Sequence, residues 1–168
     1  MSLSVDTLFQ RLYPNLRRVA YRTMEWGTPD GIVQPTSLLH DAYLRVHSYE
    51  EGKFESDAQF IRYLALTMRS LLFDAARVQI RREKLLPRTY ISLEELESKT
   101  EWRASWILDF DEALDRMEAQ DKHLFEVVIL RVFLGLPIKE IAVALDRKLR
   151  TTELHWNLAK RCLGRLSP

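Results

Sequence analysis

The sequence has little of what secreted and membrane proteins depend on. Its single cysteine, Cys162, cannot form a disulfide within the chain. The longest apolar runs, VVIL and VFLGLP, are separated by Arg131 and fall far short of the roughly 20 residues that a membrane helix needs. The first residues include Asp6 and Arg11 and lack the charged-then-apolar pattern of a signal segment. We therefore expect a cytoplasmic protein that is not embedded in a membrane.

The residue patterns of most enzymes are also missing. The chain has no glycine-rich phosphate loop and no nucleophile with a base at a recognisable spacing. Its four histidines do not have the spacing of metal ligands: His40, His47, His123 and His155. We expect no catalytic residues, no metal and no cofactor.

What the chain does have is helical periodicity. Hydrophobic residues make up 46% of the sequence and charged residues 29%, as in an ordinary globular protein. Apolar residues recur at steps of three and four, and no segment alternates as a strand would, so we predict an all-α fold. The expected helices cover residues 5–23 with a kink or break at Pro14, 35–46, 56–84, 109–134, 137–145 and 149–166. Ser56 and Gln59 have the spacing of a capping box at the start of the long helix, and Gly135 is expected to end the helix that precedes it.

We expect two small helical domains joined by an acidic linker. The domains span residues 1–86 and 109–168, and the linker spans residues 87–108, which have mixed polarity and no sustained apolar stripe. The net charge of +1 conceals a strong pattern, because residues 91–120 carry 3 Lys/Arg against 9 Asp/Glu. Residues 1–90 carry 13 against 10, and residues 121–168 carry 9 against 5. Basic ends of this kind attract polyanions, whereas an acidic middle is repelled by them.

The last two helices are joined by about four residues after Leu145, which is the outline of a helix-turn-helix. Other segments accompany this outline in a fixed order: LYPNLRRVA, QPTSLLHDAYLRV, FIRYLALTMRSLLFDAARVQIRREK, ISLEEL, ALDRM and LGLPIKEIAVAL…WNLAKRCL. Together they resemble bacterial extracytoplasmic-function (ECF) sigma factors over nearly the whole chain. The resemblance is strongest to the ECF-like subgroup in which QPT precedes the second helix.

The resemblance implies a sigma region 2-like domain, which holds core RNA polymerase and reads the downstream promoter element, and a region 4-like helix-turn-helix domain. The helix over residues 37–46 matches the segment that docks on the polymerase clamp. The residues expected on that surface are Leu38, His40, Asp41, Tyr43 and Arg45. The alternative is that Leu38, Leu39, Ala42, Tyr43 and Val46 are core and that His40 and Asp41 are a solvated pair.

The long helix over residues 56–84 is basic and carries the aromatic residues Phe60 and Tyr63 near its start. Cations that follow phosphates and rings that accept an unstacked base suit single-stranded DNA, and in the family this helix melts and reads the promoter. The candidate DNA-binding residues here are Arg62, Tyr63, Arg69, Arg77, Arg81, Arg82 and Lys84. The alternative is an ordinary solvated helix face.

Two departures from the family pattern stand out. Most ECF sigma factors have acidic residues where this chain has VQPTS, so a phosphate on Thr36, or on Ser37, is a candidate switch that would supply the missing charge at a helix N-terminus. The alternative is that Thr36 only caps the helix. In the last helix, Asp146 replaces a usual glycine and Glu153 would face phosphate.

These changes to the last helix move the expected DNA contacts into the turn. The candidates for phosphate contacts are Arg147, Lys148 and Arg150, and those for base edges are Thr151, His155 and Asn157. Equally, the domain could serve mainly to grip the polymerase flap.

The predicted function is that of a sigma factor, which binds core RNA polymerase and promoter DNA and directs transcription initiation. An anti-sigma factor or a Ser/Thr kinase is a candidate regulator. The alternative is a degenerate sigma-like regulator that binds DNA or polymerase without initiating transcription. Trp102 and Trp106 are unusual for a free linker, and we expect them to pack on a helical domain and hold the two domains together in the free protein.

Overall fold

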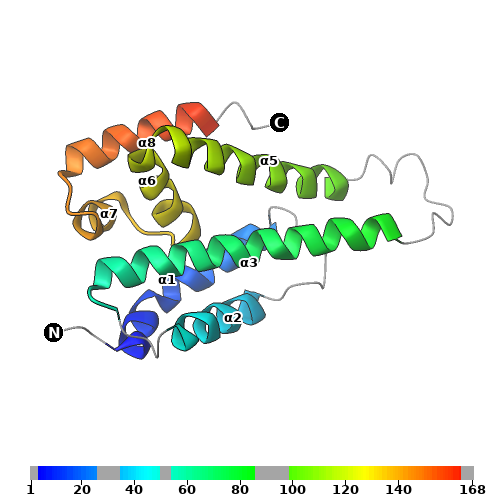
Figure 1. Ribbon diagram of the computed structural model, residues 1–168, viewed down its shortest axis with the longest axis horizontal. Coiled ribbons are helices and arrows are strands. Elements are labelled where there is room, and N and C mark those ends of the chain that lie inside the picture. Colours follow the sequence, from blue (N-terminus) through cyan, green and yellow to red (C-terminus); the bar gives the residue numbers. More distant parts are fainter. Residues whose placement is uncertain (1–3, 26–34, 50–53, 86–98, 164–168) are drawn as a thin grey trace.

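The computed structural model describes residues 4–25, 35–49, 54–85 and 99–163, with side chains omitted at 19–25, 35, 79–80, 82–85 and 99–107. Within these ranges all regular structure is helical, which confirms the all-α prediction (Figure 1). The helices are α1 (Val5–Glu25), α2 (Pro35–Ser48), α3 (Asp57–Leu85), α5 (Lys99–Gln120), α6 (Lys122–Phe133), α7 (Ile138–Ala144) and α8 (Leu149–Leu163).

Helix α3 runs through the middle of the molecule and serves both halves of the chain. Helices α1 and α2 pack on one another and on α3, while α5 and α6 pack on α3 from the other side (Figure 1). The buried side chains form a single cluster that includes Leu16 from α1, Leu64 and Met68 from α3, Leu114 from α5 and Leu130 from α6. The two halves therefore share one continuous hydrophobic core.

The start of α3 follows from a capping box in the sequence. The Gln59 backbone N–H donates to Ser56 Oγ at 3.2 Å, and Gln59 Oε1 accepts from the Glu55 backbone N–H at 2.7 Å. The first bond satisfies a backbone donor that the first helical turn leaves without a partner, and the second satisfies the N–H of the residue just before the Ser56 cap. The helix ends at Leu85, one residue beyond the expected end.

Helix α1 is continuous, so of the two outcomes expected at Pro14, a kink or a break, the break does not occur. The exposed Pro14 lies between two buried leucines, Leu12 and Leu16, which pack into the core on either side of it. Burial of the same stripe before and after the proline keeps the two parts in one helix, despite the backbone hydrogen bond that proline removes.

The predicted linker is too long at its C-terminal end. Helix α5 begins at Lys99 and not near Asp109, so residues 99–108 are helical, while residues 94, 95 and 97 of the acidic run lie outside the described residues. A four-residue spacing of large apolar residues, Trp102, Trp106, Phe110 and Leu114, was the signal in the sequence. The side chains of Trp102 and Trp106 lie outside the described residues, so their packing stays a prediction.

The expected single helix over residues 109–134 is also wrong, because it is two helices. Helix α5 ends at Gln120, and Asp121 then caps α6 by accepting hydrogen bonds from the backbone N–H groups of His123, at 2.9 Å, and Leu124, at 3.1 Å. Asp is among the preferred residues at this position because its side-chain oxygen reaches those donors.

The helix-turn-helix has the expected backbone geometry. Gly135 has a φ of 64° just after α6, and Pro137 precedes the first residue of α7. Asp146 adopts a φ of 50° in the turn before α8, which is the left-handed conformation that the family pattern assigns to glycine. The buried side of α8 carries Thr152 and Ala159.

Candidate nucleic-acid interface

One side of α3 carries three arginines about two turns apart, Arg62, Arg69 and Arg77. That side faces the C-terminal half of the chain. Each arginine forms an ion pair with an acid from α5 or α6: Arg62 with Glu126 at 2.6 Å, Arg69 with Asp111 at 2.6 Å and with Asp115 at 2.5 Å, and Arg77 with Asp111 at 2.7 Å. The basic side of α3 is therefore covered by acids of the same chain.

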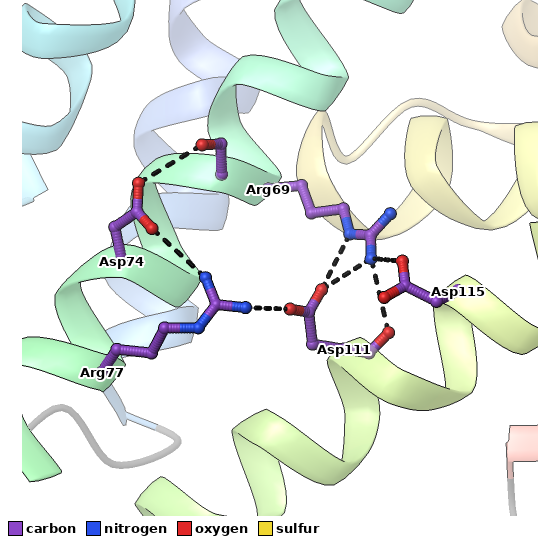
Figure 2. A network of polar contacts seen from close by, with 6 residues as sticks. Arg69, Asp74, Arg77, Asp111 and Asp115 are labelled. Atoms are coloured by element: carbon purple, nitrogen blue, oxygen red, sulfur yellow. Dashed lines mark hydrogen bonds and ion pairs between the residues drawn. The ribbon is translucent and has the colours of Figure 1, made fainter.

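Arg69 is the centre of this network (Figure 2). Its Nε donates to Asp111 Oδ1 at 3.0 Å, and its Nη2 donates to the same oxygen at 2.6 Å and to the Asp111 backbone carbonyl at 3.3 Å. The Arg69 side chain is only 12% exposed, and its guanidinium lies within 5.8 Å of the Phe73 and Phe125 ring centroids. Burial alone would lower the pKa of Arg69, but the hydrogen bonds that it donates to Asp115 and Asp111 leave that pKa raised, so the guanidinium stays charged.

Asp111 joins two of the arginines. Its Oδ1 binds Arg69, while its Oδ2 accepts from Arg77 Nη2 at 2.7 Å (Figure 2). Arg77 also contacts Asp74 on its own helix at 3.2 Å. Because Asp111 is buried, its charge depends on these two guanidinium groups for compensation.

A second acid connects α3 to the helix-turn-helix. Glu126 of α6 is buried and pairs with Arg62 on one side and with Arg147, from the turn before α8, on the other. Arg147 also donates to the His123 backbone carbonyl at 3.3 Å and lies 2.7 Å from His123 Nδ1. Glu126 thus holds together α3, α6 and the turn of the helix-turn-helix.

Several predicted DNA-binding residues are consequently not free to meet phosphate in this conformation. Arg69 and Arg147 are largely buried, and Arg62 and Arg77 are half exposed but paired, so DNA binding by these four arginines stays a prediction. Arg81 is exposed, and the side chains of Arg82 and Lys84 lie outside the described residues.

The sequence interpretation missed the acids that pair with these arginines. Asp111 and Asp115 lie one turn apart on α5, so their four-residue spacing was visible, but nothing local indicated which cations they would meet.

An aromatic cluster lies beside the start of α3. Tyr63 is half-buried, with its ring centroid 4.4 Å from that of Tyr49 and 5.7 Å from that of Phe54. Phe60, which was expected to share in accepting a base, is fully buried and belongs to the core. Tyr49, which the sequence interpretation did not single out, presents an exposed ring of the kind that can stack on an unpaired base.

The outer face of α2 differs from the expected polymerase surface at one position. His40, Asp41 and Arg45 are exposed, but Leu38 is only 3% exposed, so the expectation of an exposed Leu38 edge is wrong. Leu38 points inward because it follows the same buried stripe as Leu39, Ala42 and Val46, which the core alternative assigned correctly. The apolar residue on the outer face is instead Leu44, which is 50% exposed.

Tyr43 lies at the edge of that face. Its hydroxyl donates to Asp6 Oδ1 at 2.8 Å, and its ring packs edge-on against Phe9. The hydrogen bond to Asp6 raises the pKa of Tyr43, with smaller effects from burial and from the Asp6 charge. Tyr43 therefore attaches α2 to α1 in addition to any contact with a partner.

Thr36 and Ser37 are both exposed in the first turn of α2. Pro35 is the first residue of the helix, as expected, so Thr36 is the second helical residue and not the cap that precedes the helix. The first turn of α2 contains no acidic residue.

The outer face of α8 is mixed in character. Lys148, Arg150, Thr151 and Asn157 are exposed, as base and phosphate contacts would need to be. His155 is half-buried and stacks on His123, with ring centroids 6.0 Å apart and planes inclined by 5°. Glu153 is exposed, and three leucines lie at the surface: Leu149, Leu154, which is 57% exposed, and Leu158.

Within the described residues, no group of three or more His, Cys, Asp or Glu side chains could hold a metal ion. The helices described contain no stretch that is long and apolar enough to cross a membrane.

A family model described as ECF sigma factor matches residues 2–166, which is nearly the whole chain. Comparison with curated proteins and with solved structures found no match.

Proposed function

The chain belongs to the ECF sigma factor family, and from that membership we propose that it binds core RNA polymerase in the cytoplasm through α2 and opens specific promoters through α3. The family acts in transcription initiation, with core RNA polymerase and promoter DNA as its partners, and it is not a family of enzymes. The proposal assigns these two partners to particular faces of the described helices.

The observation that carries the proposal is the line of Arg62, Arg69 and Arg77 along α3, which begins beside Tyr49 and Tyr63. A separated DNA strand presents phosphates to cations and bases to aromatic rings, and α3 carries these arginines and begins beside the two tyrosine rings. In the conformation described, the arginines are paired with acids of α5 and α6. Stacking of an extruded base and contacts to the strand offset the few kcal/mol that unstacking a base costs, so opening by this route needs no ATP.

The proposed polymerase surface is the outer face of α2, made of His40, Asp41, Leu44 and Arg45. It combines one exposed apolar side chain with charges of both signs, a composition that suits a protein partner. Tyr43 borders this face, and its bond to Asp6 fixes α2 against α1.

We further propose that phosphorylation of Thr36, or of Ser37, strengthens polymerase binding. Both hydroxyls are exposed in a first turn that has no acid, and a phosphate there carries about −1.5 to −2 charge next to the positive end of the helix. A Ser/Thr kinase or an anti-sigma factor would be the regulatory partner.

The second candidate function is a degenerate sigma-like regulator that holds polymerase or DNA without initiating. The exposed Leu154 and Glu153 on α8 favour this alternative. A helix that docks in the major groove lies beside phosphates, which repel a carboxylate and gain nothing from an apolar side chain. In this alternative, α8 contacts protein and not the upstream promoter element.

The test is the affinity of the purified, unphosphorylated protein for bacterial core RNA polymerase. Leu44→Glu should weaken binding at least about tenfold, because a central apolar contact becomes a buried charge. Leu66→Glu is the matched control, since Leu66 is 43% exposed on α3 and lies outside the proposed surface. Equal effects of the two substitutions would refute the α2 surface.

Phosphorylation is tested with the same measurement. If only protein phosphorylated at Thr36 binds the polymerase, the switch is supported; if Thr36→Ala binds as tightly as the wild type in cells that contain the kinase, the switch is refuted. A protein that binds the polymerase but never opens a promoter would be the degenerate regulator.

A further inference from the structure

The acids that face α3 occupy the places where DNA phosphates would bind. We propose that Asp111, Asp115 and Glu126, here called the masking acids, compete with single-stranded DNA for the arginines of α3, so that the free protein holds its DNA-binding face closed. This inference rests on the proposed role of α3. It concerns the regulation of that site by the protein's own C-terminal half.

A carboxylate is a good substitute for a phosphate at a guanidinium, because it presents two oxygens to the same planar fork of N–H donors. Asp111 uses both of its oxygens in this way, one on Arg69 and one on Arg77. Glu126 does the same with Arg62 and Arg147. Two carboxylates thus engage four of the arginines that were candidates for DNA phosphate.

The masking acids and a DNA phosphate cannot occupy the Arg69 guanidinium at the same time. Arg69 lies between α3 and α5 with 12% of its side chain exposed, and two of its nitrogens already donate to Asp111 and Asp115. A phosphate can reach this guanidinium only if α5 moves away from α3. DNA binding at Arg69 therefore requires the two halves of the chain to separate.

Apolar contacts also stabilise the interface of α3 with α5 and α6. The Phe73 ring of α3 lies 6.4 Å from the Phe110 ring of α5 and 6.0 Å from the Phe133 ring of α6, centroid to centroid. Opening thus exposes aromatic surface as well as charge, and the closed form is favoured until a partner compensates for both. By linkage, a ligand that binds only the open form must open the protein, and opening must tighten that ligand's binding.

The test uses the full chain with Asp111→Asn combined with Asp115→Asn. The matched control is Asp109→Asn combined with Glu118→Gln, which removes the same charge from α5 at exposed positions for which the described residues show no ion pair. The separation of the halves is followed by energy transfer between dyes on the exposed Cys162 of α8 and on Gln10→Cys of α1. DNA binding is measured with a labelled oligothymidylate of about 20 nucleotides.

The expected result is lower energy transfer and about tenfold or more tighter oligonucleotide binding for the Asp111/Asp115 variant than for the control, because apparent affinity scales with the open fraction. Equal binding by the two variants would show that net charge alone matters, which would overturn the proposal. So would unchanged energy transfer, or opening without tighter binding.

The protein with intact masking acids provides a measurement that does not depend on the folding of the Asp111/Asp115 variant. Titrating doubly labelled Gln10→Cys protein, which keeps all three masking acids, with the oligonucleotide should lower energy transfer as binding saturates, and saturation without that change would overturn the proposal. Core-polymerase affinity, measured in parallel, separates this inference from the proposed function. If the protein opens and binds DNA more tightly but does not bind the polymerase, the proposal about the masking acids is supported and the proposed sigma role is refuted.

Discussion

Asp111→Asn should destabilise the folded chain by more than its small change in shape suggests. The substitution keeps the size of the side chain but removes the charge that compensates Arg69 and Arg77. Breaking a fully buried ion pair costs about 3–5 kcal/mol. Here Arg69 keeps Asp115 and the half-exposed Arg77 keeps Asp74, so we expect a smaller loss of about 2 kcal/mol in the free energy of unfolding.

Urea unfolding followed by circular dichroism measures this loss, and a fall of roughly 4–8 °C in Tm should accompany it. Asp109→Asn is the control, with an expected effect within about 0.5 kcal/mol, because Asp109 is exposed. A double-mutant cycle with Arg69→Gln then isolates the pair. If the two single effects simply add, or if Asp111→Asn matches its control, the reasoning about the buried network is refuted.

Three smaller predictions follow from local geometry. Asp146→Gly should raise the free energy of unfolding by roughly 0.5–1 kcal/mol in urea denaturation, because glycine adopts a φ of 50° without the Cβ clash; an unchanged or lower value would contradict this. Asp121→Ala should lower it by about 1 kcal/mol through loss of the α6 cap, whereas the neighbouring Lys122→Ala should not. The pKa of Tyr43 is raised, so the stability that its bond to Asp6 contributes is present below about pH 10 and is lost as pH rises through the folded-state pKa. The wild type should therefore be more stable than Tyr43→Phe at neutral pH but not at alkaline pH, as measured by urea denaturation. A stability difference that stays constant with pH would refute this prediction.

The role of α8 depends on which surface its partner meets. The exposed Leu154 and Leu158 lie one turn apart, with Glu153 beside them, and a phosphate backbone would meet a carboxylate there. The exposed Lys148 and Arg150 in and beside the turn remain available to DNA. Substituting the two leucines and the two cations in separate variants would show whether polymerase or DNA is the partner of this helix.

Local signals predicted much of the fold. The Ser56 and Gln59 spacing placed the start of α3, and Gly135 marked the end of α6. Both predictions depended on interactions within one or two helical turns, where residue type and spacing decide the outcome. The error at Lys99 came from giving mixed polarity more weight than a continuing apolar stripe.

The sequence by itself determined that this chain is helical, where most of its helices begin and end, and which family it resembles, because periodicity and capping are encoded in neighbouring residues. Only the tertiary structure decided that Leu38 is buried, that Leu44 is exposed, and that Arg69 meets Asp111, a residue 42 positions away. An ion pair of this kind depends on how α5 docks against α3, and that docking is set by apolar packing across the whole core. The charges of the α3 face can therefore be read from the sequence, but whether they are open to DNA depends on the packing of the two halves.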